Sequence, residues 1–273
     1  MSSYAWLTDI HLNIFGDPDV VGDKKTVQLC DKIQATNCDA VFITGDISIA
    51  KTLVYHLSVI EREIQRPIYF VLGNHDYWTS TTDIVHANMG ELEKISPFLK
   101  YLGRHSYMPI TSTTAVLGHG CWYDANYGDY KQSSMMNDWK NMGDFANKKS
   151  LEDVVSVSRK LAHAGVTHIS DAIKAATRYY NNLVILTHVP PFPQCVEGSK
   201  SQMEQLPWYV NKMCGDMLLS AAKAYPNVKF TVLTGHVHDR TSMFESKFAP
   251  NLLVKTGIAT YGNPVVQQII GLP

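Results

Sequence analysis

The chain has 273 residues, of which 45% are hydrophobic and 18% charged, as in an ordinary globular protein that can bury its core in one domain. Its 24 basic and 25 acidic residues give a formal net charge of −1, so charge offers no reason to expect nucleic acid as an obligate partner. No stretch approaches the roughly 20 apolar residues of a membrane-spanning helix, and we expect no membrane partner.

The N-terminal sequence lacks the charged, apolar and small-residue regions of a signal peptide. The five cysteines are odd in number and form no C-x-x-C pair, which is typical of reduced thiols. We therefore expect a cytoplasmic protein.

Short apolar runs rich in β-branched residues predict strands, and apolar residues at three- and four-residue spacing predict helices between them. In chain order we expect a strand at 4–8, a helix at 26–34, a strand at 40–44, a helix at 51–65, strands at 69–72 and 114–117, helices at 150–162 and 170–180, a strand at 183–187, a helix at 216–225, and strands at 230–234, 252–256 and 265–270. The early alternation favours a parallel α/β layer, and the last three strands indicate a second, partly antiparallel sheet.

The segment at 118–147 is rich in Gly, Asn, Asp and aromatic residues and shows little periodicity. Long irregular segments of this kind often serve as lids or binding loops. We predict a single domain over residues 1–273, with an insertion of loop and helix at about 118–182 that can form a substrate lid.

Five of the predicted strands end directly in side chains of the kind that bind metal ions. The sequences after them are Asp9-Ile10-His11, Gly45-Asp46, Gly73-Asn74-His75-Asp76, His188 and Gly235-His236-Val237-His238. Buried strands that deliver functional groups at one sheet edge build a rigid site. Aspartate, asparagine and histidine suit ions such as Mn, Fe, Zn or Co, whereas the absence of cysteine from these motifs disfavours a structural zinc site.

The candidate ligands are too many for one tetrahedral ion, because they number seven: Asp9, His11, Asp46, Asn74, His188, His236 and His238. Two ions that share a bridging carboxylate would use them all and leave positions for water. Such a pair, about 3.5–4 Å apart, is a known clamp for in-line displacement at phosphorus. The sequence therefore predicts a two-metal site that binds an anionic phosphate.

In this order, the motifs D-x-H, G-D, G-N-H-D, H and G-H-x-H resemble those of the calcineurin-like metallophosphoesterase superfamily, and the resemblance extends from Asp9 to His238. It implies that one metal ion is held by Asp9, His11 and His238, the other by Asn74, His188 and His236, and both by Asp46. The implied cofactors are two divalent or trivalent ions (Mn, Fe or Zn). The implied fold is a double β-sheet sandwich flanked by helices, a four-layer α/β/β/α arrangement.

The resemblance also implies a catalytic role for His75, which is not a ligand in the family. It would act as general acid toward the leaving oxygen, or stabilise charge in the transition state. Asp76 is expected to hold the His75 ring by a hydrogen bond and so determine its tautomer.

Departures from the family pattern reduce the number of activities that the resemblance allows. The stretches Gly45-Asp46-Ile47-Ser48-Ile49 and Gly73-Asn74-His75-Asp76 differ from the signatures of the protein phosphatases, and Ile49 stands where purple acid phosphatases have a tyrosine ligand. The stretch His188-Val189-Pro190-Pro191 is similar to an H-x-P-P segment of the phosphodiesterase-like branch. We expect hydrolysis of phosphodiester bonds in a small nucleotide-like substrate by a metal-bridging hydroxide. The alternatives are a phosphomonoesterase and, less favoured, a non-catalytic binding scaffold.

Aromatic residues after two strands are candidates either to stack a nucleobase or to cover the core under a long loop. They are Trp122, Tyr123, Tyr127, Phe192, Trp208 and Tyr209. Asn126 and Arg240 are candidates to contact phosphate, and His119, close to a strand end, is a candidate to line the site.

Overall fold

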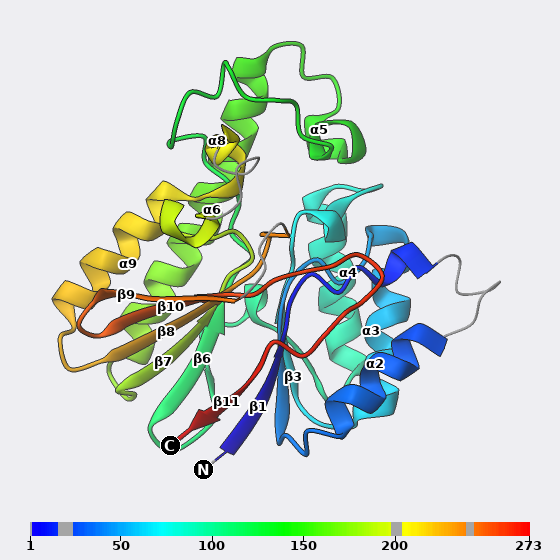
Figure 1. Ribbon diagram of the computed structural model, residues 1–273, viewed down its shortest axis with the longest axis vertical. Helices are drawn as coiled ribbons and strands as arrows, with labels where there is room; N and C mark the ends of the chain where they lie inside the picture. The colour runs from blue at the N-terminus through cyan, green and yellow to red at the C-terminus, as the bar shows by residue number, and fades with distance from the viewer. Residues whose placement is uncertain (1, 16–23, 198–203, 239–242) are drawn as a thin grey trace.

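The computed structural model describes residues 2–15, 24–197, 204–238 and 243–273, and it contains two β-sheets that pack face to face (Figure 1). The first sheet has the strand order β11 (Gln268–Leu272), β1 (Ser2–Leu7), β2 (Ala40–Thr44), β3 (Ile68–Val71) and β4 (Leu99–Tyr101). Strands β1 to β4 are parallel, and β11 pairs with β1 in the antiparallel direction.

The second sheet has the order β5 (Met108–Pro109), β6 (Thr114–Gly118), β7 (Asn182–Leu186), β8 (Lys229–Thr234), β10 (Leu252–Thr256) and β9 (Phe244–Ala249). Its inner strands are parallel and its two edge strands antiparallel. The expectation that the last strand belongs to this sheet is wrong. Gln267 N donates to Trp6 O, and β11 then covers the edge of β1, which would otherwise remain unpaired.

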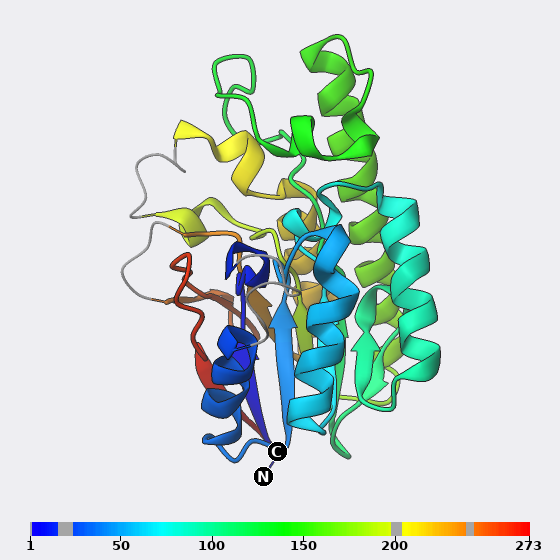
Figure 2. The same ribbon diagram turned by 90° about the vertical axis from the view of Figure 1, so that its right-hand side faces the viewer.

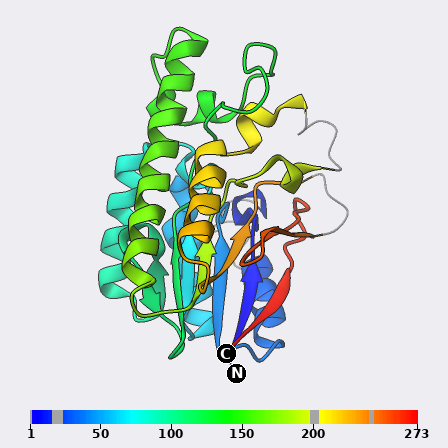
Figure 3. The ribbon, with the colours of Figure 1, turned by 90° about the vertical axis from the view of Figure 1, so that its left-hand side faces the viewer.

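Helices cover the outer faces of both sheets, so the expected four-layer arrangement of α/β/β/α is confirmed. The first sheet is covered by α2 (Lys24–Gln34), α3 (Ala50–Ile64) and α4 (Thr82–Ile95), as Figure 2 shows. The second is covered by α6 (Leu151–Ala176) and α9 (Lys212–Ala224), as Figure 3 shows. The short helices are α5 (Asp138–Asn141) and α8 (Leu206–Tyr209), with 3-10 turns at Leu12–Phe15, His75–Tyr77, Leu102–Arg104, Gly143–Phe145 and Pro193–Val196.

The central strands are buried on both faces, which explains their nearly continuous apolar sequences. Along β1, Tyr4 and Trp6 pack between the two sheets, whereas Ala5 and Leu7 pack against the helices. The layer between the sheets also contains Phe42 and side chains from β6, β7 and β8. This shared core holds the strand ends of both sheets in fixed relative positions.

Helix α6 is continuous over 26 residues, so the prediction of two helices at 150–162 and 170–180 is wrong in its division. The predicted start is confirmed, because the Ser150 and Asp153 side chains form a capping box. Ser170 does not begin a new helix, because buried Ile169 and Ile173 flank it at a spacing that continues the apolar face of α6. In the part of the chain that the structure describes, no helix combines the length and apolar character needed to cross a bilayer.

Candidate metal centre

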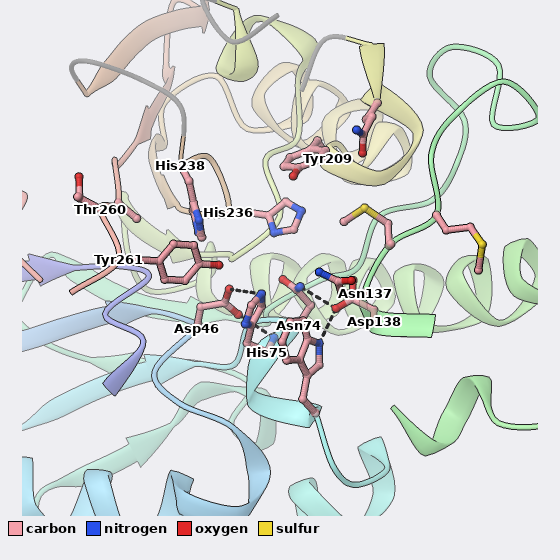
Figure 4. A pocket seen from close by; sticks show the side chains of 15 residues that line it. Asp46, Asn74, His75, Asn137, Asp138, Tyr209, His236, His238, Thr260 and Tyr261 are labelled. Atoms are coloured by element: carbon pink, nitrogen blue, oxygen red, sulfur yellow. Dashed lines mark hydrogen bonds and ion pairs between the residues drawn. The ribbon is translucent and has the colours of Figure 1, made fainter. Parts of the chain in front are cut away.

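All seven predicted ligands come just after the ends of β1, β2, β3, β7 and β8, and close contacts bring them together. Four of them, Asp46, Asn74, His236 and His238, are labelled in Figure 4. Backbone hydrogen bonds join the segments that follow these strands. Asp9 N donates to Gly45 O at 3.0 Å, and Gly235 N donates to His188 O at 3.0 Å. The site is therefore built from both sheets rather than from one loop.

The backbone at the site is strained in a way that is typical of functional residues. Four predicted ligands have positive φ angles: 49° at Asp9, 41° at His11, 51° at Asp46 and 68° at His236. Residues with a Cβ atom seldom adopt this left-handed conformation, and its cost is tolerated where the surrounding structure holds the chain. These turns redirect the chain at the strand ends and aim the side chains at one another.

Gly45 has φ +90° and must lack a side chain for a second reason. A Cβ atom there would lie 2.6 Å from Gly73 N and 2.7 Å from His188 Nδ1. The glycine before Asp46 therefore allows the ends of β2, β3 and β7 to approach one another closely.

The first group of ligands consists of Asp9, His11, Asp46 and His238. Each offers one oxygen or nitrogen atom, and these four atoms lie within 4.8 Å of one another. His238 Nε2 lies 2.9 Å from Asp9 Oδ1, and His11 Nε2 lies 3.3 Å from His238 Nε2. Asp46 Oδ2 lies 3.6 Å from His11 Nε2.

The second group surrounds His188 Nε2. This atom lies 3.0 Å from Asn74 Oδ1, 3.2 Å from His236 Nδ1 and 3.4 Å from Asp46 Oδ1. The two oxygens of Asp46 therefore face different groups, Oδ2 the first and Oδ1 the second. A carboxylate in this position can be shared by two ions.

The tautomers of two imidazoles are set by backbone carbonyls. His188 Nδ1 donates to Thr44 O at 2.8 Å, and His236 Nε2 donates to Trp208 O at 3.1 Å. In each ring the other nitrogen keeps its lone pair and faces the cluster. Metal-binding histidines are commonly oriented in this manner, so the donor set fits metal ions.

Burial lowers the pKa of His11 to about 3 and that of His236 to about 3, with further effects from neighbouring imidazoles. Both rings are therefore neutral near pH 7, which is the state that ligates metals. Burial, with the carboxylates of Asp9 and Asp76, raises the pKa of Asp46 well above its usual range. Cations next to Asp46 would favour its ionised form, so the electrostatics also fit a metal site.

His75 lies beside this cluster, with its side chain 14% exposed and Nε2 3.9 Å from Asp46 Oδ2. Its ring stacks on Trp78, with 3.6 Å between the ring centroids and 23° between the planes. Burial and the neighbouring histidines lower the pKa of His75 to about 2.

Asp76 does not hold the His75 ring, and that prediction is wrong for the residues described. Asp76 Oδ1 accepts hydrogen bonds from Ile47 N and Ser48 N at 2.9 and 2.8 Å, and Oδ2 accepts one from Gly73 N at 2.8 Å. The carboxylate thus joins the loops after β2 and β3. These partners are therefore backbone amides of the two loops rather than the His75 ring.

A cavity of about 540 Å³ opens over the ligands (Figure 4). Its aromatic lining consists of Trp78, Tyr209 and Tyr261, and the segment at 118–147 adds Met135, Met136, Asn137 and Asp138. The Tyr209 ring centroid lies 4.8 Å from that of His236, and the Tyr261 centroid lies 4.5 Å from that of His11. Among the described lining residues there is no Lys or Arg.

The substrate-side candidates separate into two groups. Trp122, Tyr123, Phe192 and Trp208 are buried in the core, Tyr127 packs beside a small apolar cluster, and Asn126 accepts a hydrogen bond from Arg159. Only Tyr209 of the aromatic candidates lines the cavity over the metal ligands. His119 lines a separate cavity of about 430 Å³, and Arg240 lies outside the described residues.

The sequence analysis did not name several residues that line the site, among them Trp78, Asp138 and Tyr261. Trp78 follows the G-N-H-D motif by two positions, which is a signal that could have identified it. Asp138 lies in the segment at 118–147, which was predicted as a lid without any single residue being marked, and Tyr261 lies far in sequence from every motif.

The family model described as calcineurin-like phosphoesterase matches residues 3–240. Among solved structures, phosphopantetheinyl hydrolase (PptH) from Mycobacterium tuberculosis is similar with a TM-score of 0.63 and 12% identity, over 95% of this chain and 90% of that chain. A dimetal phosphatase from Danio rerio is similar with a TM-score of 0.57 and 11% identity, over 93% and 86%. A comparison with curated proteins found no match. At these identities the structural likeness shows the fold alone.

Proposed function

Because the chain belongs to the calcineurin-like phosphoesterase family, whose members depend on two metal ions, we propose that it is a two-metal phosphodiesterase acting on a small, nucleotide-like diester. One ion would be held by Asp9, His11 and His238, the other by Asn74, His188 and His236, and both by Asp46. When bound, the ions supply positive charge to the phosphoryl oxygens and activate water as the nucleophile. The native metal is Mn, Fe or Zn in this proposal.

The chain's own residues perform the remaining tasks. The bonds from His188 to Thr44 O and from His236 to Trp208 O keep each imidazole lone pair directed at the cluster. His75 lines the cavity next to Asp46 and would donate a hydrogen bond to an oxygen of the reacting phosphate or of the leaving group.

The volume and the lining of the cavity support a phosphodiester rather than a phosphomonoester as the substrate. Its volume of about 540 Å³ falls in the range of sites for small organic ligands, roughly 300–1,000 Å³, and exceeds what a phosphate needs. A phosphodiester has one negative charge and two organic substituents that need room. The described lining offers aromatic, thioether and amide groups to such substituents, and it offers no side-chain cation to a second negative charge.

Three aromatic side chains support a nucleotide-like substituent. Trp78, Tyr209 and Tyr261 line the cavity, and each also contacts a histidine of the site. Stacking of a base on an aromatic ring is worth about 1–3 kcal/mol. In the same proposal the segment at 118–147 is the substrate lid, because Met135, Met136 and Asn137 come from it. Four buried cysteines with free thiols, Cys30, Cys38, Cys121 and Cys214, support a reducing, cytoplasmic location.

The first test compares bis(p-nitrophenyl) phosphate with p-nitrophenyl phosphate as substrates of Mn-reconstituted protein, with Asp46→Asn as the control. We expect two bound Mn ions and a higher kcat/KM for the diester, lost in the variant. A higher kcat/KM for the monoester would favour the phosphomonoesterase alternative, and protein that binds no metal would favour the scaffold. Diester turnover would then justify a panel of cyclic nucleotides and dinucleotides. A phosphopantetheinyl diester belongs in it because one structural neighbour is named a hydrolase of that group.

A further inference from the structure

Asp138 is a buried carboxylate that accepts three hydrogen bonds beside the candidate metal centre. It is 1% exposed and lies in α5, within the segment at 118–147. Its Oδ1 accepts from Asn74 Nδ2 at 2.9 Å and from Trp78 Nε1 at 2.6 Å (Figure 4). Its Oδ2 accepts from the hydroxyl of Tyr123 at 3.1 Å. Asp138 belongs to none of the strand-end motifs, so they do not account for a carboxylate in this place.

These bonds determine which way the Asn74 amide faces. The indole Nε1 of Trp78 can only donate, so Asp138 Oδ1 acts as an acceptor and the Asn74 group next to it is the NH₂. The carbonyl oxygen of Asn74 is then directed to His188 Nε2, 3.0 Å away, in the second ligand group. Only the oxygen of an amide ligates such metals, so the opposite orientation would remove Asn74 from the ligand set.

We propose that Asp138 is a positioning residue for the second metal ion: it turns the Asn74 oxygen toward the cluster. The proposal rests on the two-metal part of the proposed function. It explains why a carboxylate 64 residues from Asn74 is buried against it. It also ties the segment at 118–147 to the metal site, so a chain that lacks this contact would bind the second ion weakly.

Asp138 Oδ1 also holds Trp78, the residue on which the His75 ring stacks. Trp78 donates to Asp138 Oδ1, and the Trp78 ring stacks on His75 with 3.6 Å between centroids. Asp138 thus restrains a candidate catalytic ring through Trp78, which is the task that the sequence pattern suggested for Asp76. One carboxylate orients a metal ligand and the ring beside it.

Titration of metal-free protein with MnCl₂ in a calorimeter tests the proposal without using esterase activity. Wild-type protein is expected to bind two ions. In Asp138→Ala we expect the first site to be unchanged and the affinity of the second to fall about 10–100-fold, the usual effect of removing a group that orients a ligand. Asp138→Asn should restore the second site, because its amide oxygen can accept from Asn74 and Trp78 while its NH₂ donates to Tyr123.

Asp144→Ala is the matched control, because Asp144 belongs to the same segment and accepts from Thr82 N and Oγ1 at 2.9 and 2.6 Å without contacting a predicted ligand. It should bind both ions as wild type does. Wild-type affinities in Asp138→Ala would overturn the proposal. An equal loss of affinity for the second ion in Asp144→Ala would also overturn it, because it would indicate a general loosening of the segment. An equal loss in Asp138→Asn would overturn it as well, because it would indicate that the negative charge of Asp138 is required. Wild-type protein that binds fewer than two ions would instead refute the proposed function.

Asp138→Ala removes the acceptor of three donors, two of which belong to the buried residues Asn74 and Tyr123, and folding is checked by circular dichroism. If that variant does not fold, a crystal structure of Mn-loaded wild-type protein decides. We expect Asn74 Oδ1 on the second ion and Asn74 Nδ2 still bonded to Asp138. An Asn74 amide turned the other way, or separated from Asp138, would overturn the inference.

Discussion

Replacement of His75 by alanine removes an imidazole that lines the cavity without belonging to either predicted ligand group. Its Nε2 lies 3.9 Å from Asp46 Oδ2, so a phosphate bound between the two predicted ligand groups would come within reach of the His75 ring. Loss of one donor to a developing negative charge costs about 10²–10³ in kcat, or roughly 2.7–4 kcal/mol. Loss of a general acid costs about 10²–10⁴. We expect kcat to fall by about 10²–10⁴-fold while both metal ions stay bound.

The dependence on leaving group separates the two roles of His75. Steady-state kinetics would compare bis(p-nitrophenyl) phosphate, which has a good leaving group, with a dinucleoside phosphate, whose alkoxide leaves poorly. A general acid predicts a greater loss for the dinucleoside phosphate, because p-nitrophenolate departs without a proton. A stabiliser of phosphoryl charge predicts the same loss for both.

His163→Ala, on the exposed surface of α6, controls for the loss of a histidine elsewhere. Full activity of His75→Ala on the dinucleoside phosphate, with two metal ions bound, would refute the role assigned to His75.

Three further predictions concern the metal ions, the substrate and pH. Asp46→Asn should lose both ions and all turnover; elemental analysis that finds two ions per chain would contradict a bridging Asp46. Tyr261→Ala should raise KM for a nucleotide diester about tenfold, equivalent to about 1.4 kcal/mol of stacking, whereas the exposed Tyr179→Ala should not; an unchanged KM would exclude stacking there. Burial, with His168 and His86 nearby, lowers the pKa of His119 to about 3, so the unfolded chain binds a proton at this residue between about pH 6.5 and 3 that the folded chain does not. The contribution of His119 to the free energy of unfolding therefore decreases as pH falls through this range, by about 2 kcal/mol at pH 5 relative to pH 7. Urea unfolding of His119→Gln should show a smaller decrease than wild type or His163→Gln, and an equal decrease would contradict the burial argument.

The sequence determined the features that depend on neighbouring residues. An apolar run followed at once by Asp, His or Asn predicts both a buried strand and the chemical groups at its end. The strand at 40–44 was predicted at its observed bounds, with Asp46 just beyond it, because strand formation and side-chain type are both local properties. The capping box of α6 was predictable for the same reason, since Ser150 and Asp153 lie within one turn.

The tertiary structure alone decided which distant groups meet. Asp138 lies 64 residues from Asn74, and β11 pairs with β1 across the whole length of the chain. The family resemblance implied that Asp76 holds the His75 ring, yet the oxygens of Asp76 accept hydrogen bonds from the amides of two loops. Such contacts follow from how the layers pack, and packing depends on the shapes of many side chains at once rather than on any short pattern. The sequence thus predicted which chemical groups follow the strand ends, whereas the fold determined which distant groups contact them.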